Sequence, residues 1–227
     1  LPTGVAIPGL LDPATGISFV ANIPAQGRSV RDALAARFGE AIPVVNDCMA
    51  FAYSEAHGGA AQDARTVVGL ILGTGVGAGL CIDGALPHRH GGLPVEIGHL
   101  GASARMIARH GLPLIPCGCG RAGCLERYIS GTGISALTEH ITGTRIEASD
   151  LAASPHAEEV LAVWADLAGE CLDALQITLD PDCIVLGGGL SNLPGIERRL
   201  SDALVRWRLG PARAPAIRLA RFGATSG

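Results

Sequence analysis

One histidine and three cysteines near the middle of the chain have the donor types of a metal site. His99 is followed, after a spacer, by the run CGCGRAGC, which contains Cys117, Cys119 and Cys124. One nitrogen and three sulfurs are the Cys3His donor set of a closed, tetrahedral zinc site. Cys117 and Cys119 are too close for an easy disulfide, and the intervening glycines allow the tight turns of a chelating loop. The sequence therefore predicts a structural zinc ion. Unligated cysteines beside an unrelated histidine are the alternative.

Two glutamates flank this predicted zinc motif. Glu96 precedes His99 by three residues, and Glu126 follows Cys124 by two residues. Because a zinc ion that joins His99 to the three cysteines would fold the chain back on itself, both carboxylates are expected to lie close together. The motif therefore predicts a scaffold that supports a polar pocket.

Asp47 stands where a strand is expected to give way to a helix. Residues 42–45 are mostly β-branched, Asn46 and Asp47 end this strand, and CMAFAYSEAHG has helical spacing up to a stop at Gly58. The positive end of a helix dipole favours an ionised carboxylate, and the end of a strand opens toward a cleft. Asp47 is therefore a candidate base. Simple helix capping by both residues is the alternative.

Two glycine-rich runs follow apolar strands. GTGVGAG covers residues 73–79 between two expected strands, and GGG covers residues 187–189 between a strand and a helix expected over 195–208. The first run looks like a dinucleotide fingerprint, but that fingerprint must open a helix, so a Rossmann site is rejected. Backbone N–H groups of the first run, with the Thr74 hydroxyl, can contact phosphate. In the second run the backbone can approach a nucleotide closely. A glycine hairpin without a ligand is the alternative.

The elements that must position these residues alternate between strands and helices, which is typical of the α/β class. VAIPG predicts a strand that ends in a turn, and residues 12–16 predict a loop. A helix is expected from a Ser29 cap to Gly39, and buried strands are expected at 67–72 and 183–186. Further helices are expected from Thr132 to Thr142 and from Ser154-Pro155 to Leu179.

Composition limits the classes of function that the chain can have. Its 227 residues can form one large or two modest cores, and a net charge of −4 gives no basic footprint for nucleic acid or an anionic membrane. No apolar run is long enough to cross a bilayer, and the first residues lack the features of an export signal. Seven cysteines, an odd number, fit a reducing compartment. We therefore expect a soluble, cytoplasmic protein.

Four motifs together resemble the ROK family (repressors, open reading frames, kinases): LILGTGVGAGL, VEIGHL, CGCGRAGCLERYISG and IVLGGGLSN. The resemblance covers nearly the whole chain. It implies an actin-like/hexokinase-like (ribonuclease H-like) α/β fold of two lobes with a structural zinc site. Residues 1–60 would belong to the N-terminal lobe and residues 61–227 to the C-terminal lobe. It further implies transfer of phosphate from ATP, with Mg²⁺, to the 6-hydroxyl of a sugar, with N-acetyl-D-glucosamine the expected acceptor.

The resemblance also implies roles for single residues. Asp47 matches the catalytic base, and Asn46 matches a sugar contact beside it. Glu96, His99 and Glu126 match the remaining sugar contacts, since paired carboxylates suit vicinal hydroxyls. His99 would bind zinc through one ring nitrogen and face the sugar with the other. Nucleotide contacts are expected at Gly73, Thr74, Gly75, Gly77, Gly187, Gly188 and Gly189.

The family pattern extends beyond this chain at both ends. Its first hairpin, with an Asp-x-Gly-Gly-Thr phosphate loop, and its closing helix have no counterpart here, so the chain is expected to be part of a longer protein. The alternatives are a sugar-sensing repressor of the same family, a kinase for glucose, fructose or N-acetylmannosamine, and a zinc-stabilised domain without activity. Asp47 favours a kinase. The expected partners are a sugar and ATP, without membrane or nucleic acid, and a homodimer is left open.

Overall fold

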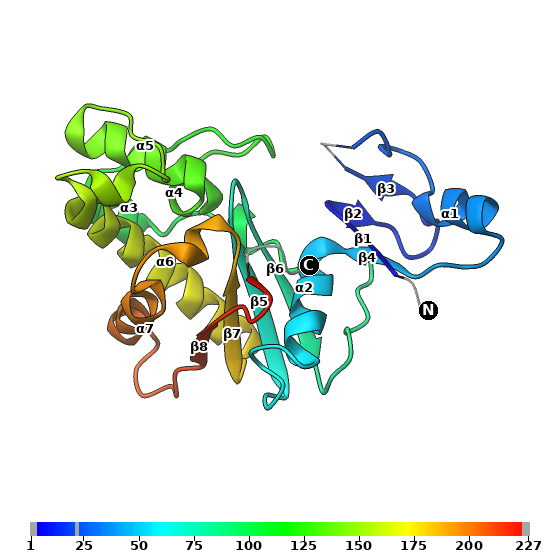
Figure 1. The fold of residues 1–227 in the computed structure, drawn as a ribbon. Helices are drawn as coiled ribbons and strands as arrows, with labels where there is room; N and C mark the ends of the chain where they lie inside the picture. The colour runs from blue at the N-terminus through cyan, green and yellow to red at the C-terminus, as the bar shows by residue number, and fades with distance from the viewer. Residues whose placement is uncertain (1–3, 21–22, 224–227) are drawn as a thin grey trace.

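The computed structural model describes residues 4–20 and 23–223, which form a small N-terminal lobe and a larger C-terminal lobe (Figure 1). In the small lobe, β1 (Val5–Ile7) pairs in parallel with β4 (Val44–Asn46). Strand β2 (Leu10–Leu11) pairs antiparallel with β3 (Ser18–Phe19). Helix α1 (Val30–Phe38) packs against the small apolar core that these strands form.

The residues predicted to begin and end α1 do so, and one strand of the small lobe begins later than predicted. Ser29 Oγ accepts the N–H of Asp32 at 3.1 Å at the start of α1, and Gly39 ends the helix with a φ of 75°. The strand expected over 42–45 is displaced to β4, which begins after Pro43. Proline has no N–H to donate, so it cannot contribute a full pair of ladder bonds.

The large lobe is built on a four-stranded sheet with the order β6-β5-β7-β8. Strand β5 (Thr66–Leu72) is antiparallel to β6 (Val76–Ile82) and parallel to β7 (Cys183–Gly187), which is parallel to β8 (Ala216–Leu219). The glycine-rich run after β5 therefore turns the chain back into a neighbouring strand. This hairpin confirms that the run is not a Rossmann fingerprint.

Most of the large lobe's helices cover one face of this sheet (Figure 1). The buried side chains of Val68, Leu70 and Leu72 point to that face, and Trp164 donates its Nε1–H to Ile129 O at 3.0 Å within the same core. No helix among residues 4–20 and 23–223 is both long and apolar enough to cross a membrane. The covering helices are α3 (Ala104–His110), α4 (Glu126–Ile129), α5 (Gly131–Thr142), α6 (Ala157–Leu179) and α7 (Ile196–Trp207).

Helix α2 (Asp47–Ala56) packs against the opposite face of the same sheet. Phe51 joins the second core cluster, and the strands beneath it carry glycine where a side chain would collide: a Cβ on Gly187 would lie 2.7 Å from Phe51 Cζ. The contact at Gly79 is closer still, because a Cβ added there would lie 1.9 Å from Cys48 O. Since α2 is packed on the large lobe, we propose that the lobes meet at Asn46 and Asp47 and not near residue 60.

The boundaries of the later helices differ slightly from the sequence prediction. Helix α5 begins at Gly131 and is capped by buried Ser130, whose Oγ accepts the N–H of Gly133 at 3.0 Å, so Thr132 lies inside the helix and not at its cap. Helix α6 matches the prediction to Leu179, and Asp180 ends it with a φ of 43°. A 3-10 turn, η3 (Gly189–Asn192), separates the glycine run from α7.

The loop between β6 and Glu96, which belongs to the large lobe, also contacts the small lobe. Gly92 approaches the small lobe so closely that a Cβ there would lie 1.8 Å from Leu11 O. The same loop then returns to the sheet, where Val95 pairs with Ala78. Glu96 therefore directly follows a residue paired with the sheet, four residues after a contact between the two lobes.

Candidate active site

Asn46 holds the junction between the lobes. It is the N-cap of α2: its Oδ1 accepts the N–H groups of Cys48 and Met49 at 2.9 and 3.2 Å. Its Nδ2 donates to Gly9 O at 2.9 Å, and the residue is only 7% exposed. Because these bonds use the acceptor and one of two donors, a single N–H is left for the predicted sugar contact. The capping alternative is therefore correct for Asn46 and does not exclude that contact.

Asp47 is the first residue of α2 and is half-buried. Its Oδ1 accepts the N–H of Cys48 at 2.9 Å. A helix start favours negative charge, and the carboxylate also forms a side-chain hydrogen bond with the Cys48 thiol. The strand-to-helix position predicted for Asp47 is confirmed, and its role as base stays a prediction.

The close packing of α2 on glycine makes the position of Asp47 testable. We expect Gly79→Ala to push the first turn of α2 off the sheet, because the new Cβ would meet the Cys48 carbonyl group. Overpacking of this kind lowers the free energy of unfolding by about 1–3 kcal/mol. Turnover should fall together with stability, as measured by chemical denaturation and steady-state kinetics.

The control for Gly79→Ala is Gly91→Ala. No atom lies within 4 Å of a Cβ built at Gly91, and its φ is not positive. Alanine at residue 91 should therefore leave both stability and turnover close to the parent values. Equal, small effects of the two substitutions would contradict the role given to the Gly79 contact.

Glu126 connects the zinc motif to the glycine-rich hairpin. It is the first residue of α4, and its Oε2 accepts the N–H of Val76 at 3.0 Å. A Cβ on Gly75 would lie 2.7 Å from the same oxygen, so glycine is needed there for the carboxylate to dock. Glu126 therefore fixes the hairpin turn next to its own helix, and its second oxygen has no partner among the described residues.

Glu96 faces the other predicted sugar-binding residues. Its Oε2 lies 3.8 Å from His99 Nε2, and both side chains are about one-third exposed, at 32% and 31%. Burial raises the pKa of Glu96, the charges of Glu126 and Asp47 raise it further, and His99 opposes the shift. Burial and the charge of Asp47 likewise raise the pKa of the Cys48 thiol. Asp47, Glu96 and Glu126 therefore act on one shared, partly dry space.

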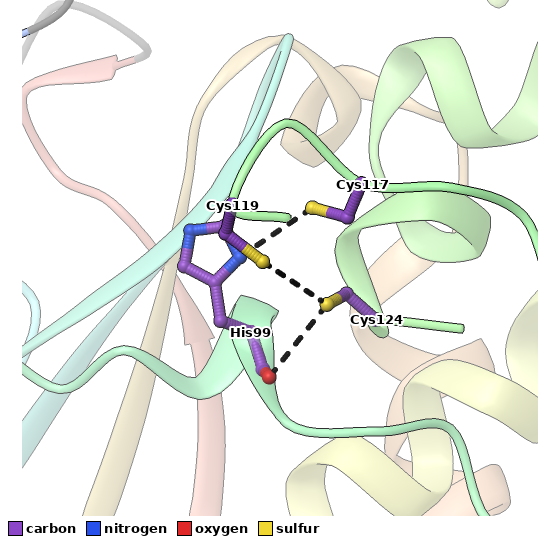
Figure 2. Close-up of side chains that lie close together, drawn as sticks. All are labelled: His99, Cys117, Cys119 and Cys124. Atoms are coloured by element: carbon purple, nitrogen blue, oxygen red, sulfur yellow. Dashed lines mark hydrogen bonds between the residues drawn. The ribbon is translucent and has the colours of Figure 1, made fainter. Parts of the chain in front are cut away.

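The predicted metal ligands do come together, as Figure 2 shows. The donor atoms of His99, Cys117, Cys119 and Cys124 all lie within 4.8 Å of one another. Cys117 Sγ is 3.7 Å from His99 Nδ1, and Cys119 Sγ is 3.6 Å from Cys124 Sγ. Two sulfurs on a tetrahedral zinc ion, each about 2.3 Å from the metal, are separated by about 3.8 Å. The spacing fits a zinc ion and is far too long for a disulfide.

The side chains around the cluster suit a metal in two further ways. Because Nδ1 of His99 faces the cysteines, Nε2 is left to point toward Glu96, in agreement with the predicted double use of the ring. Burial raises the pKa of the Cys124 thiol to about 12, so a free thiol here would keep its proton at neutral pH. A bound zinc ion displaces such a proton and takes the thiolate as its ligand.

A cavity of about 660 Å³ lies beyond the hairpin turn, within the size range of small-ligand sites. Gly73 O accepts the N–H of Gly131 at 2.8 Å, which ties the turn to the start of α5. The first residues of this helix line the cavity, so its positive dipole end lies at the cavity wall. The lining residues nearest these turns are Gly73, Thr74, Gly131, Thr132, Gly189 and Asn192.

The seven residues predicted to bind nucleotide divide into two groups. Gly73, Thr74 and Gly189 line the cavity. The other four glycines make room for neighbouring protein atoms: Gly75 for Glu126, Gly77 for Cys48, Gly187 for Phe51 and Gly188 for the Leu72 carbonyl group. Gly77 also lies inside β6, paired with Ile71, and not in the turn.

Sequence reasoning missed the part of the cavity wall that lies between α5 and α6. Glu147 and Ser149 line the cavity but stand in no glycine run and follow no strand. No local signal in the sequence identifies them, because their proximity depends on how two helices pack around the hairpin turn.

The chain forms two lobes of α/β structure, with a carboxylate at their junction and a cavity beside a glycine hairpin. Its likeness to solved sugar kinases indicates the actin-like/hexokinase-like fold. The ROK family model matches residues 2–227, and the chain belongs to the ROK family. This membership confirms the resemblance seen in the four motifs.

Relatives and solved structures agree with this assignment. The chain is 39% identical over 230 residues to the N-acetylgalactosamine kinase of Shewanella sp. strain ANA-3, covering 99% of this chain and 74% of that protein. It is 38% identical over 232 residues to the N-acetyl-D-glucosamine kinase of Yersinia enterocolitica, covering 99% and 77%. The ROK glucokinase of Streptomyces griseus, solved with glucose and AMPPNP, has a TM-score of 0.80 at 26% identity, covering 98% and 77%.

Proposed function

We propose that this chain is an ATP-dependent sugar kinase that phosphorylates the 6-hydroxyl of N-acetyl-D-glucosamine. The observation that supports this proposal best is that one hairpin turn, between β5 and β6, borders both the proposed sugar site and the cavity proposed for the nucleotide. At one end of this turn, Glu126 binds Val76 within the acidic space around Asp47 and Glu96. At its other end, Gly73 and Thr74 line the cavity. A sugar in the first site and a nucleotide in the second would meet at the turn.

The chemistry of phosphoryl transfer fits the groups in these two sites. The reaction needs mainly positioning and charge stabilisation, plus one base that accepts the hydroxyl proton. Asp47, whose hydrogen-bond donors among the described residues are the N–H and the thiol of Cys48, is the proposed base. Backbone N–H groups of the hairpin turn and the start of α5 are the proposed contacts to the phosphates of Mg²⁺-bound ATP.

The sugar is proposed to bind between Glu96, Glu126 and the free Nε2–H of His99, with Asn46 contributing its remaining N–H. Carboxylates accept hydrogen bonds from hydroxyls, and His99 and Asn46 can donate to sugar oxygens. His99, Cys117, Cys119 and Cys124 are the proposed zinc ligands. The ion would fix the ring of His99 and the loop that leads into Glu126. Since these thiols must stay reduced, we place the protein in the cytoplasm.

N-acetyl-D-galactosamine is the second candidate acceptor, because the Shewanella relative that carries this name is as similar as the glucosamine kinases. The two sugars differ only in the configuration of one ring hydroxyl. The repressor alternative has less support, because both relatives are named as kinases and this chain carries Asp47, the proposed base. A zinc-stabilised domain without activity would bind no sugar at all.

A coupled ATP-turnover assay of the full-length protein tests the proposal. The acceptors are N-acetyl-D-glucosamine, N-acetyl-D-galactosamine, N-acetylmannosamine, glucose and fructose at equal concentrations. We expect the highest kcat/KM with N-acetyl-D-glucosamine. Sugar binding by calorimetry without turnover would identify a sensor, and the absence of both would identify an interaction domain.

The raised pKa of Glu96 gives a prediction in which binding and stability move in opposite directions. A carboxyl whose pKa is raised by folding destabilises the folded state when it is ionised, that is, above its unfolded pKa. We therefore expect Glu96→Gln to raise the midpoint of thermal unfolding at pH 7. The same change should raise KM for the sugar by about 10-fold or more, because it removes a charged acceptor.

The pH dependence of the parent protein checks the same point. Sugar affinity should fall on acidification at a higher pH than an ordinary glutamate would give, and this step should be absent in Glu96→Gln. A variant that loses stability and keeps its KM would show that Glu96 has a structural role only.

A further inference from the structure

We propose that Glu147 binds the ribose of the nucleotide and makes the protein select ribonucleotides over 2′-deoxyribonucleotides. The inference rests on the proposed kinase function and deepens it. Glu147 lines the 660 Å³ cavity together with residues of the glycine turns.

The cavity has one end suited to phosphate and another suited to a base. The N–H groups of Gly73 and Gly131 are used within the protein, by Gly75 O and Gly73 O. Thr74 and Thr132 therefore supply the donors at the first end, where the dipole of α5 favours negative charge. Apolar side chains form the other wall: Ala152, Leu190, Leu193 and Pro194. A carboxylate would repel a triphosphate, so Glu147 can serve only the uncharged part of a nucleotide.

The hydrogen bonds of Glu147 place it next to the phosphate end. Its Oε2 accepts the Ser135 hydroxyl at 3.0 Å, and Ser135 Oγ is also 3.4 Å from Gly131 O. Ser135 follows Gly131 by four residues, which is about 6 Å along a helix axis at about 1.5 Å per residue. Glu147 is therefore held about one sugar ring's length from the helix start, where a ribose would follow the phosphates.

The carboxylate of Glu147 is held in place but keeps free acceptor capacity. Oε1 lies 3.3 Å from Arg145 Nε, and the side chain is 61% exposed. Each carboxylate oxygen has two lone pairs, so one acceptor site on each oxygen is left beside the bond to Ser135 and the contact with Arg145. Two such sites match the vicinal 2′- and 3′-hydroxyls of a ribose. A 2′-deoxyribose leaves one of them unpaired.

Arg145 supplies a matched control. It also pairs with Glu139, whose Oε2 lies 3.5 Å from Arg145 Nη1 and whose side chain is 60% exposed. Glu139 and Glu147 thus pair with the same arginine and have nearly equal exposed fractions, but only Glu147 lines the cavity. Loss of the Arg145 pair is common to Glu147→Ala and Glu139→Ala, but Glu147→Ala also removes the bond from Ser135. The ratio of the values for ATP and 2′-deoxyATP in each variant therefore carries the test, because the Ser135 bond does not depend on the 2′-hydroxyl.

The test combines kinetics with binding. For the parent protein, Glu147→Ala and Glu139→Ala, KM and kcat are measured with ATP and with 2′-deoxyATP at saturating N-acetyl-D-glucosamine. Calorimetric titrations with ADP and 2′-deoxyADP follow without sugar. We expect the parent to prefer the ribonucleotide about 10-fold, which is the size of one lost hydrogen bond to a charged acceptor. Glu147→Ala should raise KM for ATP about 10-fold, leave kcat nearly unchanged and abolish the preference.

The outcomes separate this inference from the proposed function. Equal effects of Glu147→Ala and Glu139→Ala, or a ribonucleotide preference that survives in Glu147→Ala, would overturn the role of Glu147 while turnover stands. A preference for ADP that disappears in Glu147→Ala would support it even if no sugar were phosphorylated. Absence of nucleotide binding by the parent would overturn both proposals.

Discussion

Replacing Asp47 with asparagine is expected to lower kcat about a hundredfold or more while leaving the fold and sugar affinity nearly unchanged. The amide keeps the size and the oxygen that accepts the Cys48 N–H at 2.9 Å, but it cannot take a proton from the sugar hydroxyl. The measurement is kcat and KM for N-acetyl-D-glucosamine, with thermal unfolding as the check on folding.

The matched control for Asp47→Asn is Asp32→Asn. Asp32 is also an acidic residue in the first turn of a helix, α1, and it is exposed. Both substitutions remove a favourable charge–dipole interaction of about 0.3–1 kcal/mol. Only Asp47→Asn should lower kcat. Near-parent turnover in that variant would show that another group is the base.

Replacing Cys119 with serine is expected to remove zinc and to destabilise the large lobe together with the sugar site. Cys119 is exposed, so serine should cost little if the residue carries no metal. If it is one of four ligands, the free energy of metal binding that contributes to folding is largely lost. The measurements are zinc content by elemental analysis, the unfolding midpoint, and sugar affinity.

Cys171→Ser separates loss of metal from loss of stability. Cys171 is fully buried in the main core and is not part of the cluster. Serine there buries a hydroxyl and should lower stability, but zinc content should stay at one equivalent. Less than half an equivalent of zinc in the parent protein, prepared without chelator, would refute the metal site.

The pH profile of Glu96 and the nucleotide preference of Glu147 differ in how far the sequence could predict them. Glu96 stands three residues before His99 in a recognisable motif, so its place in a polar pocket was predictable. Its raised pKa was not, because that shift depends on burial and on the charges of Glu126 and Asp47. Glu147 was not predicted at all, since it reaches the cavity only through the packing of α5.

The sequence by itself determined the local elements and the chemistry that they carry. Capping by Ser29, the strand-to-helix step at Asp47 and the Cys3His donor set depend on residues close together in the chain, so their signals are local. The family motifs added the pairing of a sugar site with a nucleotide site.

Only the tertiary structure decided which glycines make room for neighbouring protein atoms. Gly77 and Gly187 stand in runs predicted to approach a nucleotide, and they lie under α2, next to Cys48 and Phe51. What packs over a glycine is set by segments far away in the chain. The burial of the apolar face of α2 against the sheet, which supports the proposed meeting point of the lobes, depends on distant segments for the same reason.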